Sequence, residues 1–120
     1  MQTRTISPSG YKALFDSLSR IYSGSSATLE LLDKDFGAQH EVDEQPLRGI
    51  SYDKDGLELH LTTRDGTHLV HRIPQPKRVQ LEERDDGLVE AIAIESEGDP
   101  RAILHFHPAV ASRLLGAATQ

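Results

Sequence analysis

The sequence contains no cysteine, so a disulfide framework, a thiolate zinc site and a cysteine nucleophile are all excluded. It has no tryptophan either, and aromatic residues make up only 5% of the chain. No apolar run is long enough to span a bilayer, and the polar start MQTRTISPSG lacks the apolar core of a signal peptide. We therefore expect a cytoplasmic protein that does not bind membranes.

Basic residues are in the minority. The 13 lysines and arginines are outnumbered by 19 aspartates and glutamates, which gives a formal net charge of −6. Nucleic-acid affinity depends largely on neutralising phosphates with Lys and Arg, so we expect no nucleic-acid partner. The chain has 120 residues, of which 37% are hydrophobic and 27% charged, as in one ordinary globular domain covering residues 1–120.

Residues 7–22 have the spacing of an amphipathic helix. Apolar side chains recur three or four residues apart, at Tyr11, Leu14, Phe15, Leu18, Ile21 and Tyr22. Ser7 is a favourable N-cap, and Pro8 falls at the first helical position, where its missing N–H costs nothing. Gly24 suits a left-handed helix stop. We expect this apolar stripe to cover the core of the domain.

Beyond Gly24 the period changes from helical to alternating. Turn-forming clusters separate short alternating runs, at residues 33–37, 43–46, 53–56, 64–67, 74–77, 84–87 and 97–100. In residues 57–62 the leucines alternate with polar side chains, so the strand buries one face only. Regularly spaced turns of this kind are typical of an antiparallel meander, barrel or sandwich.

The expected fold is therefore α+β. The N-terminal helix packs on an antiparallel β-meander of about seven or eight short strands, which covers about residues 27–107. Residues 108–120 form a short tail. The sheet is either a small barrel that resembles SH3-like or Sm-like domains, or a strongly curved open sheet with the helix in its hollow. Gly49 marks a bulge or a sharp bend in either form.

The acidic turns raise the question of calcium binding. The stretch DKDG, which ends at Gly56, resembles the start of a calcium loop, but the next ligand position holds Leu57. Asp-x-Asp-Gly between two strands is also a hairpin turn, in which the glycine supplies a positive φ. We interpret residues 53–56 and 84–87 as hairpin turns.

No pattern of catalytic residues is present. Phosphate-binding glycine spacings and a G-x-S-x-G elbow are absent, so we expect no catalytic residue and no cofactor. The six histidines all fall on expected strands: His40, His60, His68, His71, His105 and His107. His105 and His107 lie two apart and share one strand face, opposite the apolar side chains between them. Two imidazoles supply only half of a transition-metal shell, so we interpret this pair as a solvated face without a metal.

The segment HLVHRIPQPKR, residues 68–78, concentrates positive charge in an acidic chain. The candidate binding residues are His68, His71, Arg72, Lys77 and Arg78. His71 shares its strand face with Leu69 and Ile73, so we expect a neutral histidine that is at least half-buried. Pro74 and Pro76 make the following turn rigid. Such a patch attracts an acidic protein partner or the acidic turns of a second copy. Alternatively, its charges and prolines only protect an edge strand from unwanted pairing.

Seven blocks between about residues 11 and 108 carry a resemblance to a known family: LFDSLSR with the following Gly24, TLELL, FGAQHE, PLRGIS, HLVHRIPQPKRVQLE, EAIAIES and ILHFHP. The chain resembles an uncharacterised bacterial family catalogued as a domain of unknown function (DUF5335-like). None of the blocks is a catalytic motif, so the resemblance implies a shared fold and no activity. Basic residues other than histidine are common in the family at the positions of His105 and His107, which argues against a metal there.

Two functions of different classes remain. The first is a non-catalytic protein–protein interaction module or homo-oligomer that uses a sheet edge or face. The second is a small-ligand-binding protein or enzyme with a pocket between helix and sheet. An exposed edge with apolar neighbours favours the first, and a cavity lined by convergent polar groups favours the second.

Overall fold

A computed structural model describes residues 1–33, 35, 37–98 and 100–115, with the side chains of residues 40 and 112 also outside the description. The elements in chain order are β1 (Gln2–Ile6), the 3-10 helix η1 (Pro8–Gly10), α1 (Tyr11–Tyr22), β2 (Ser26–Asp33), β3 (Gly37–Asp53), β4 (Gly56–Thr62), β5 (His68–Ile73), β6 (Pro76–Glu83), β7 (Leu88–Ser96), β8 (Arg101–Ala111) and the 3-10 helix η2 (Ser112–Leu114). Of the six histidines on expected strands, His40 therefore has its side chain outside the description.

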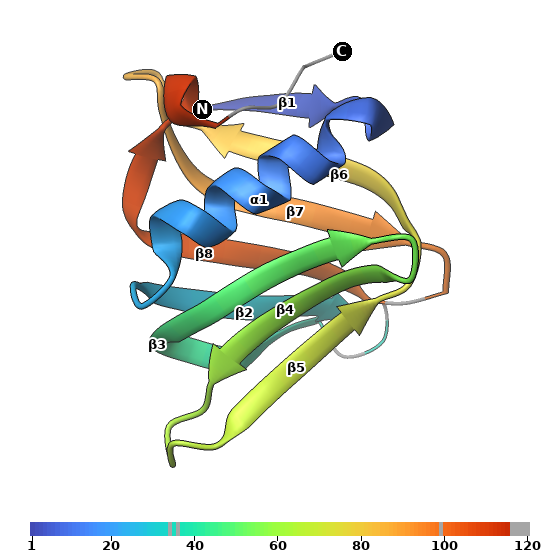
Figure 1. Ribbon diagram of the computed structural model, residues 1–120, viewed down its shortest axis with the longest axis vertical. Coiled ribbons are helices and arrows are strands. Elements are labelled where there is room, and N and C mark those ends of the chain that lie inside the picture. Colours follow the sequence, from blue (N-terminus) through green and yellow to red (C-terminus); the bar gives the residue numbers. More distant parts are fainter. Residues whose placement is uncertain (34, 36, 99, 116–120) are drawn as a thin grey trace.

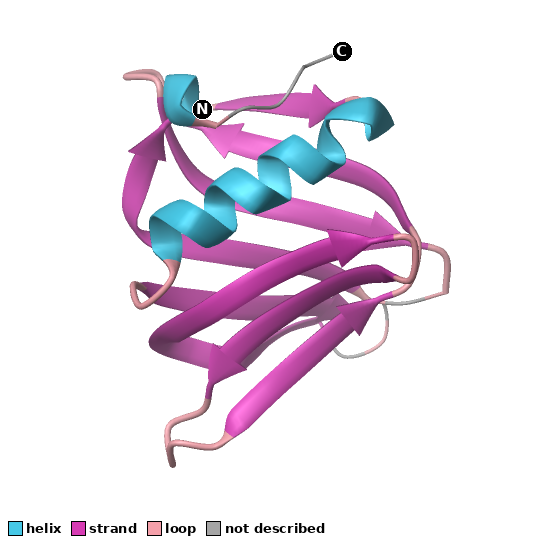
Figure 2. Ribbon diagram, in the orientation of Figure 1, coloured by secondary structure: helices cyan, strands magenta, loops and turns pink. Residues whose placement is uncertain are grey.

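All eight strands form one antiparallel sheet in the order β1-β6-β7-β8-β2-β3-β4-β5. The sheet curves around α1, which lies across its hollow (Figures 1 and 2). In the described part of the chain β1 and β5 are the two ends of the order, so the sheet is open. The α+β prediction is confirmed in its open, curved form, and the sheet does not close into an SH3-like or Sm-like barrel.

The strand order is not that of a simple meander. The runs β2 to β5 and β6 to β8 each pair in sequence, but β5 and β6 are not neighbours, and β8 pairs with β2 instead. The strand β1 adds to β6 and was not expected, because its residues QTRTI include only one apolar side chain. Its Ile6 nevertheless faces the core and is 1% exposed.

The helix stripe packs into the core as predicted. Tyr11, Leu14, Phe15, Leu18 and Tyr22 are all buried, whereas Ile21 is only partly buried. The Tyr22 ring stacks on Phe106 of β8 at a centroid distance of 4.5 Å. Proline is at the first helical position, but the first turn is a 3-10 helix, and the Ser7 side chain makes no capping bond.

The prediction of a turn between strands at residues 43–46 is wrong, because these residues lie within β3, which is 17 residues long. The chain changes direction inside the strand instead of leaving the sheet. Glu44 takes a positive φ of 48°, and the pairing with β2 shifts register beside it. The Glu44 N–H donates to Thr28 Oγ1 at 3.0 Å, which holds this bulge in place. The bulge expected at Gly49 is confirmed by a register shift between β3 and β4.

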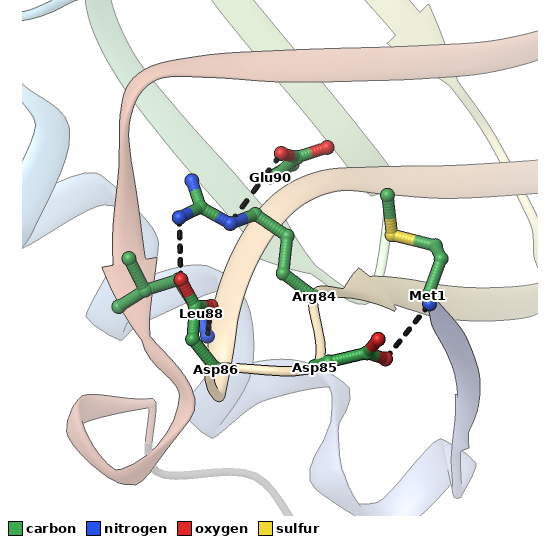
Figure 3. Close-up of polar contacts among 6 residues, drawn as sticks. All are labelled: Met1, Arg84, Asp85, Asp86, Leu88 and Glu90. Carbon is green, nitrogen blue, oxygen red and sulfur yellow. Dashed lines mark hydrogen bonds and ion pairs between the residues drawn. The ribbon is translucent and has the colours of Figure 1, made fainter.

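The acidic clusters at 53–56 and 84–87 are hairpin turns, as predicted. Gly56 has a φ of 121°, and a Cβ there would lie 2.7 Å from the Pro74 carbonyl oxygen, so only glycine fits. In the β6–β7 turn, Asp86 pairs with Arg84 and accepts the Leu88 N–H at 3.1 Å (Figure 3). The Arg84 hydrogen bond is the main cause that lowers the pKa of Asp86. Asp86 therefore stabilises its own turn, whereas Asp85 Oδ1 lies 2.9 Å from the amino group of Met1 (Figure 3).

Candidate functional site

The predicted binding residues do not share one surface. His68, His71 and Arg72 lie on β5, and Lys77 and Arg78 lie on β6. We call the face of the sheet that carries α1 the inner face and the opposite one the outer face. His71 lies opposite the fully buried Leu59 and so belongs to the inner face, where it is half-buried as predicted. His68 and Arg72 are exposed on the outer face.

Each cation of the segment 68–78 faces a carboxylate of the same chain. Arg72 Nη2 lies 2.6 Å from Glu58 Oε2. Lys77 Nζ lies 2.9 Å from Glu97 Oε2, and Arg78 Nε lies 3.3 Å from Glu95 Oε2. The positive potential of the segment is therefore largely compensated locally. Its role as the binding surface stays a prediction.

The outer face of β4 and β5 holds a connected chain of polar side chains that we call the Glu58 network: Arg72, Glu58, His60 and His68. His60 Nε2 lies 3.1 Å from Glu58 Oε1, and His60 Nδ1 lies 3.1 Å from His68 Nε2. Glu58 and His60 come from β4 and the other two from β5. Sequence reasoning missed Glu58 and His60 because only the pairing register of the two strands brings them to His68 and Arg72.

The predicted pair on β8 does lie on one face. Leu104 and Phe106 are buried, and both histidines point to the outer face. His107 Nε2 lies 3.1 Å from Thr28 Oγ1, and His105 Nε2 lies 3.6 Å from Glu30 Oε1. Each imidazole thus turns to a different oxygen on β2.

Within the described residues, no three His, Asp or Glu side chains are grouped so that they could hold a metal ion. The pKa values of Tyr22 and Asp65 are shifted by burial and by hydrogen bonding. Burial raises the pKa of Tyr22 to about 12, and hydrogen bonds from Thr63 and Thr67 lower the pKa of Asp65 to about 2. Tyr22 lies in the core and Asp65 in the β4–β5 turn, so neither is placed as a catalytic acid or base.

A hollow lies where the helical segment begins against the sheet, as the second predicted function requires. It has a volume of about 330 Å³ and is lined by Thr5, Ile6, Pro8, Tyr11, Lys77, Arg78 and Gln80. Its two cations already pair with Glu97 and Glu95. A second cleft of about 440 Å³ lies beside Glu58 and Arg72 and is lined otherwise by Ser51, Asp53, Asp55 and Gly56. In this cleft, too, the one cation, Arg72, already pairs with Glu58.

Among the described residues β5 is one of the two end strands of the sheet, with β4 as its neighbour (Figure 1). The Glu58 network lies on these two strands. The Thr63 N–H donates to the Thr67 carbonyl at 2.8 Å, which identifies this pair as hydrogen-bonded. Because such pairs alternate along antiparallel strands, Leu69, His71 and Ile73 direct their backbone groups to β4. The backbone groups of His68, Val70 and Arg72 then point away from the sheet. Val70 is 39% exposed, so this edge also offers an apolar side chain.

In the part of the chain that the structure describes, these features define an α+β protein with one α-helix in the hollow of an open eight-stranded sheet and a polar network on the end strand β5 and its neighbour β4. The chain belongs to the family of unknown function DUF5335, whose sequence model matches residues 2–113. It is 34% identical over 110 residues to an uncharacterized protein of the bacterium Aquifex aeolicus (strain VF5), which covers 92% of this chain and 96% of that protein. No solved structure matches the chain. None of the described helices has the length and apolar content needed to cross a membrane.

Proposed function

We propose that the protein is a non-catalytic interaction module that associates with a second copy of itself through the free edge of β5. The observation that carries this proposal is that β5 has a strand neighbour on one side only among the described residues, so the outward backbone groups of His68, Val70 and Arg72 can add another strand to the sheet. Six residues with one exposed valine make a short edge, so we expect weak association, with a dissociation constant of tens to hundreds of micromolar.

The side chains of β5 are compatible with antiparallel pairing to an identical strand. If His71 lies opposite its counterpart, Leu69 lies opposite Ile73 of the other copy on the inner face. On the outer face, Val70 then lies opposite Arg72, whose aliphatic stem can cover it. Glu58 already compensates the Arg72 charge at 2.6 Å. The pairing therefore brings apolar surface together without burying an unpaired charge.

The opposite edge of the sheet provides a comparison. In β1 the exposed alternate position is held by Thr3, which donates to Glu82 Oε2 at 3.0 Å, where β5 has Val70. An edge with a polar, hydrogen-bonded side chain offers less apolar surface to another strand. We therefore assign the association to β5.

Sedimentation velocity over a concentration series, with a chelator present, tests the proposal. We expect a reversible monomer–dimer equilibrium that Val70→Lys abolishes, because lysine on an edge strand opposes pairing. Val70→Pro provides a second variant, since the Val70 N–H points away from β4 and its loss leaves the ladder intact. The matched control is Thr3→Lys on the other edge, which should keep the dimer.

A chain that stays monomeric at all concentrations, or that loses its dimer equally in the Thr3→Lys variant, contradicts the assignment to β5. Circular dichroism must show that each variant remains folded.

The salt dependence of the dissociation constant distinguishes edge pairing from charge-mediated binding by the segment 68–78. Two copies that each carry a net charge of −6 repel, so edge pairing should strengthen as salt screens that repulsion. Lys77→Glu combined with Arg78→Glu should change the dissociation constant by no more than a few-fold. Association that weakens with salt and disappears in this double variant would instead support the charge-mediated binding surface.

A further inference from the structure

On the outer face of β4 and β5, two imidazole rings lie in direct contact with each other. His60 on β4 lies opposite Val70, and His68 lies opposite Thr62, so the two histidines are diagonal neighbours across adjacent strands. Their ring centroids are 5.2 Å apart, and His60 Nδ1 is 3.1 Å from His68 Nε2. One nitrogen of each ring thus faces the other at hydrogen-bond distance.

The contact of His60 Nε2 with Glu58 determines which nitrogen of the His60 ring carries the proton and which carries the lone pair. Glu58 Oε1 lies 3.1 Å from His60 Nε2, and Glu58 Oε2 lies 2.6 Å from Arg72 Nη2. A carboxylate that faces an arginine accepts hydrogen bonds, so the neutral His60 carries its proton on Nε2. The lone pair of His60 then lies on Nδ1, directed at His68. A carboxylate behind an imidazole is the usual second-shell support of a histidine that binds a metal ion.

We propose that His60 Nδ1 and His68 Nε2 chelate a divalent transition-metal ion of the zinc or copper type. With Zn–N bonds of about 2.0–2.1 Å and tetrahedral angles, two such nitrogens lie about 3.3 Å apart. The observed 3.1 Å is close to that separation, and both rings must turn so that their lone pairs meet at the metal ion instead of along the line between the two nitrogens. Imidazole nitrogens suit zinc, copper and nickel better than magnesium or calcium.

In the metal-free protein the 3.1 Å contact is a hydrogen bond from His68 Nε2–H to His60 Nδ1. On metal binding this bond is replaced by the two metal–nitrogen bonds, and the neutral His68 carries its proton on Nδ1. Because the described residues add no third ligand, water fills the remaining positions. The site is therefore open and accessible to an added ligand.

This site differs from the pair predicted not to bind metal. The Nε2 atom of His105 faces Glu30 and the Nε2 atom of His107 faces Thr28, so these two nitrogens are directed at separate oxygens and not at each other. Those two histidines thus supply a control within the same chain and on the same face of the sheet.

Calorimetric titration of the full chain with zinc chloride, in a buffer that does not coordinate metals, tests the proposal. We expect saturable binding of one ion per chain, lowered about tenfold or more by His68→Ala. Glu58→Gln should lower the affinity about 10- to 100-fold, because the orienting carboxylate is lost. His105→Ala and His107→Ala should leave the binding unchanged.

Copper(II) electron paramagnetic resonance gives a second readout, in which two coupled imidazole nitrogens are expected and one is lost in His68→Ala. The absence of saturable zinc binding overturns the proposal. So does an affinity that is unchanged in His68→Ala, or binding that disappears in His105→Ala or His107→Ala.

Discussion

Replacing Phe15 with alanine removes a ring that lies at the centre of the contact between α1 and the sheet. The side chain is 0% exposed. Its ring lies 6.2 Å from that of Tyr11 and 5.6 Å from that of Tyr52 on β3, centroid to centroid. The substitution therefore leaves a cavity and ends two aromatic contacts, one of them between helix and sheet.

The expected loss of unfolding free energy is about 4 kcal/mol for Phe15→Ala, because large-to-small core substitutions of Phe cost about 3–5 kcal/mol. Leu18 is also 0% exposed, and Leu18→Ala should cost about 3 kcal/mol. The matched control is Lys12→Ala on the solvent side of α1. Its ion pair with Asp16 at 3.1 Å is exposed, so its loss should cost less than about 0.5 kcal/mol.

Urea titration followed by far-UV circular dichroism measures these differences, with m-values compared to check that the transition stays two-state. A loss below about 0.5 kcal/mol at both Phe15 and Leu18 refutes the docking of α1 in the hollow of the sheet. A loss at Lys12 equal to that at Phe15 would mean that burial in the core does not determine the effect, because alanine has a higher helix propensity than either residue.

Two further predictions concern ionisation. The pKa of Tyr22, raised from 10.0 to about 12 by burial, means that its contribution to stability is complete below pH 10 and is lost as pH rises towards 12. Absorbance titration should show this late tyrosinate, and Tyr22→Phe should cost about 1 kcal/mol through the hydrogen bond to the Pro108 carbonyl. The pKa of Asp65, lowered from 3.8 to about 2 by hydrogen bonds from Thr63 and Thr67, means that its contribution is present above pH 3.8 and is lost as pH falls towards 2. NMR titration of the carboxyl carbon should show this shift; an ordinary value would contradict the turn geometry, and Asp65→Asn should remove the pH dependence.

The sequence by itself was sufficient for the features that depend on local periodicity and backbone freedom. The apolar spacing of three and four in residues 11–22 identifies a helix and its buried face, because side chains at that spacing share one side. The alternating leucines of residues 57–62 identify a strand with one buried face for the same reason. Gly56 and Gly87 mark turns because a positive φ favours residues without a Cβ.

Local patterns were insufficient where longer-range pairing overrides them. The cluster at 43–46 contains turn formers, yet β2 holds it within β3 through the Thr28 hydroxyl. The strand at residues 2–6 has one apolar residue and forms because β6 supplies a partner edge. The contact of β8 with β2 joins segments about 75 residues apart, and no sequence period encodes it.

The candidate sites divide in the same way. The sequence determined that His105 and His107 share a face, and that His71 faces the core with Leu69, because side chains alternate along one strand. Only the tertiary structure decided that Arg72, Lys77 and Arg78 each meet a carboxylate of the same chain. It also decided that His60 meets His68, since that contact depends on the register between two strands, and a slip of one residue would send one of the imidazoles to the opposite face.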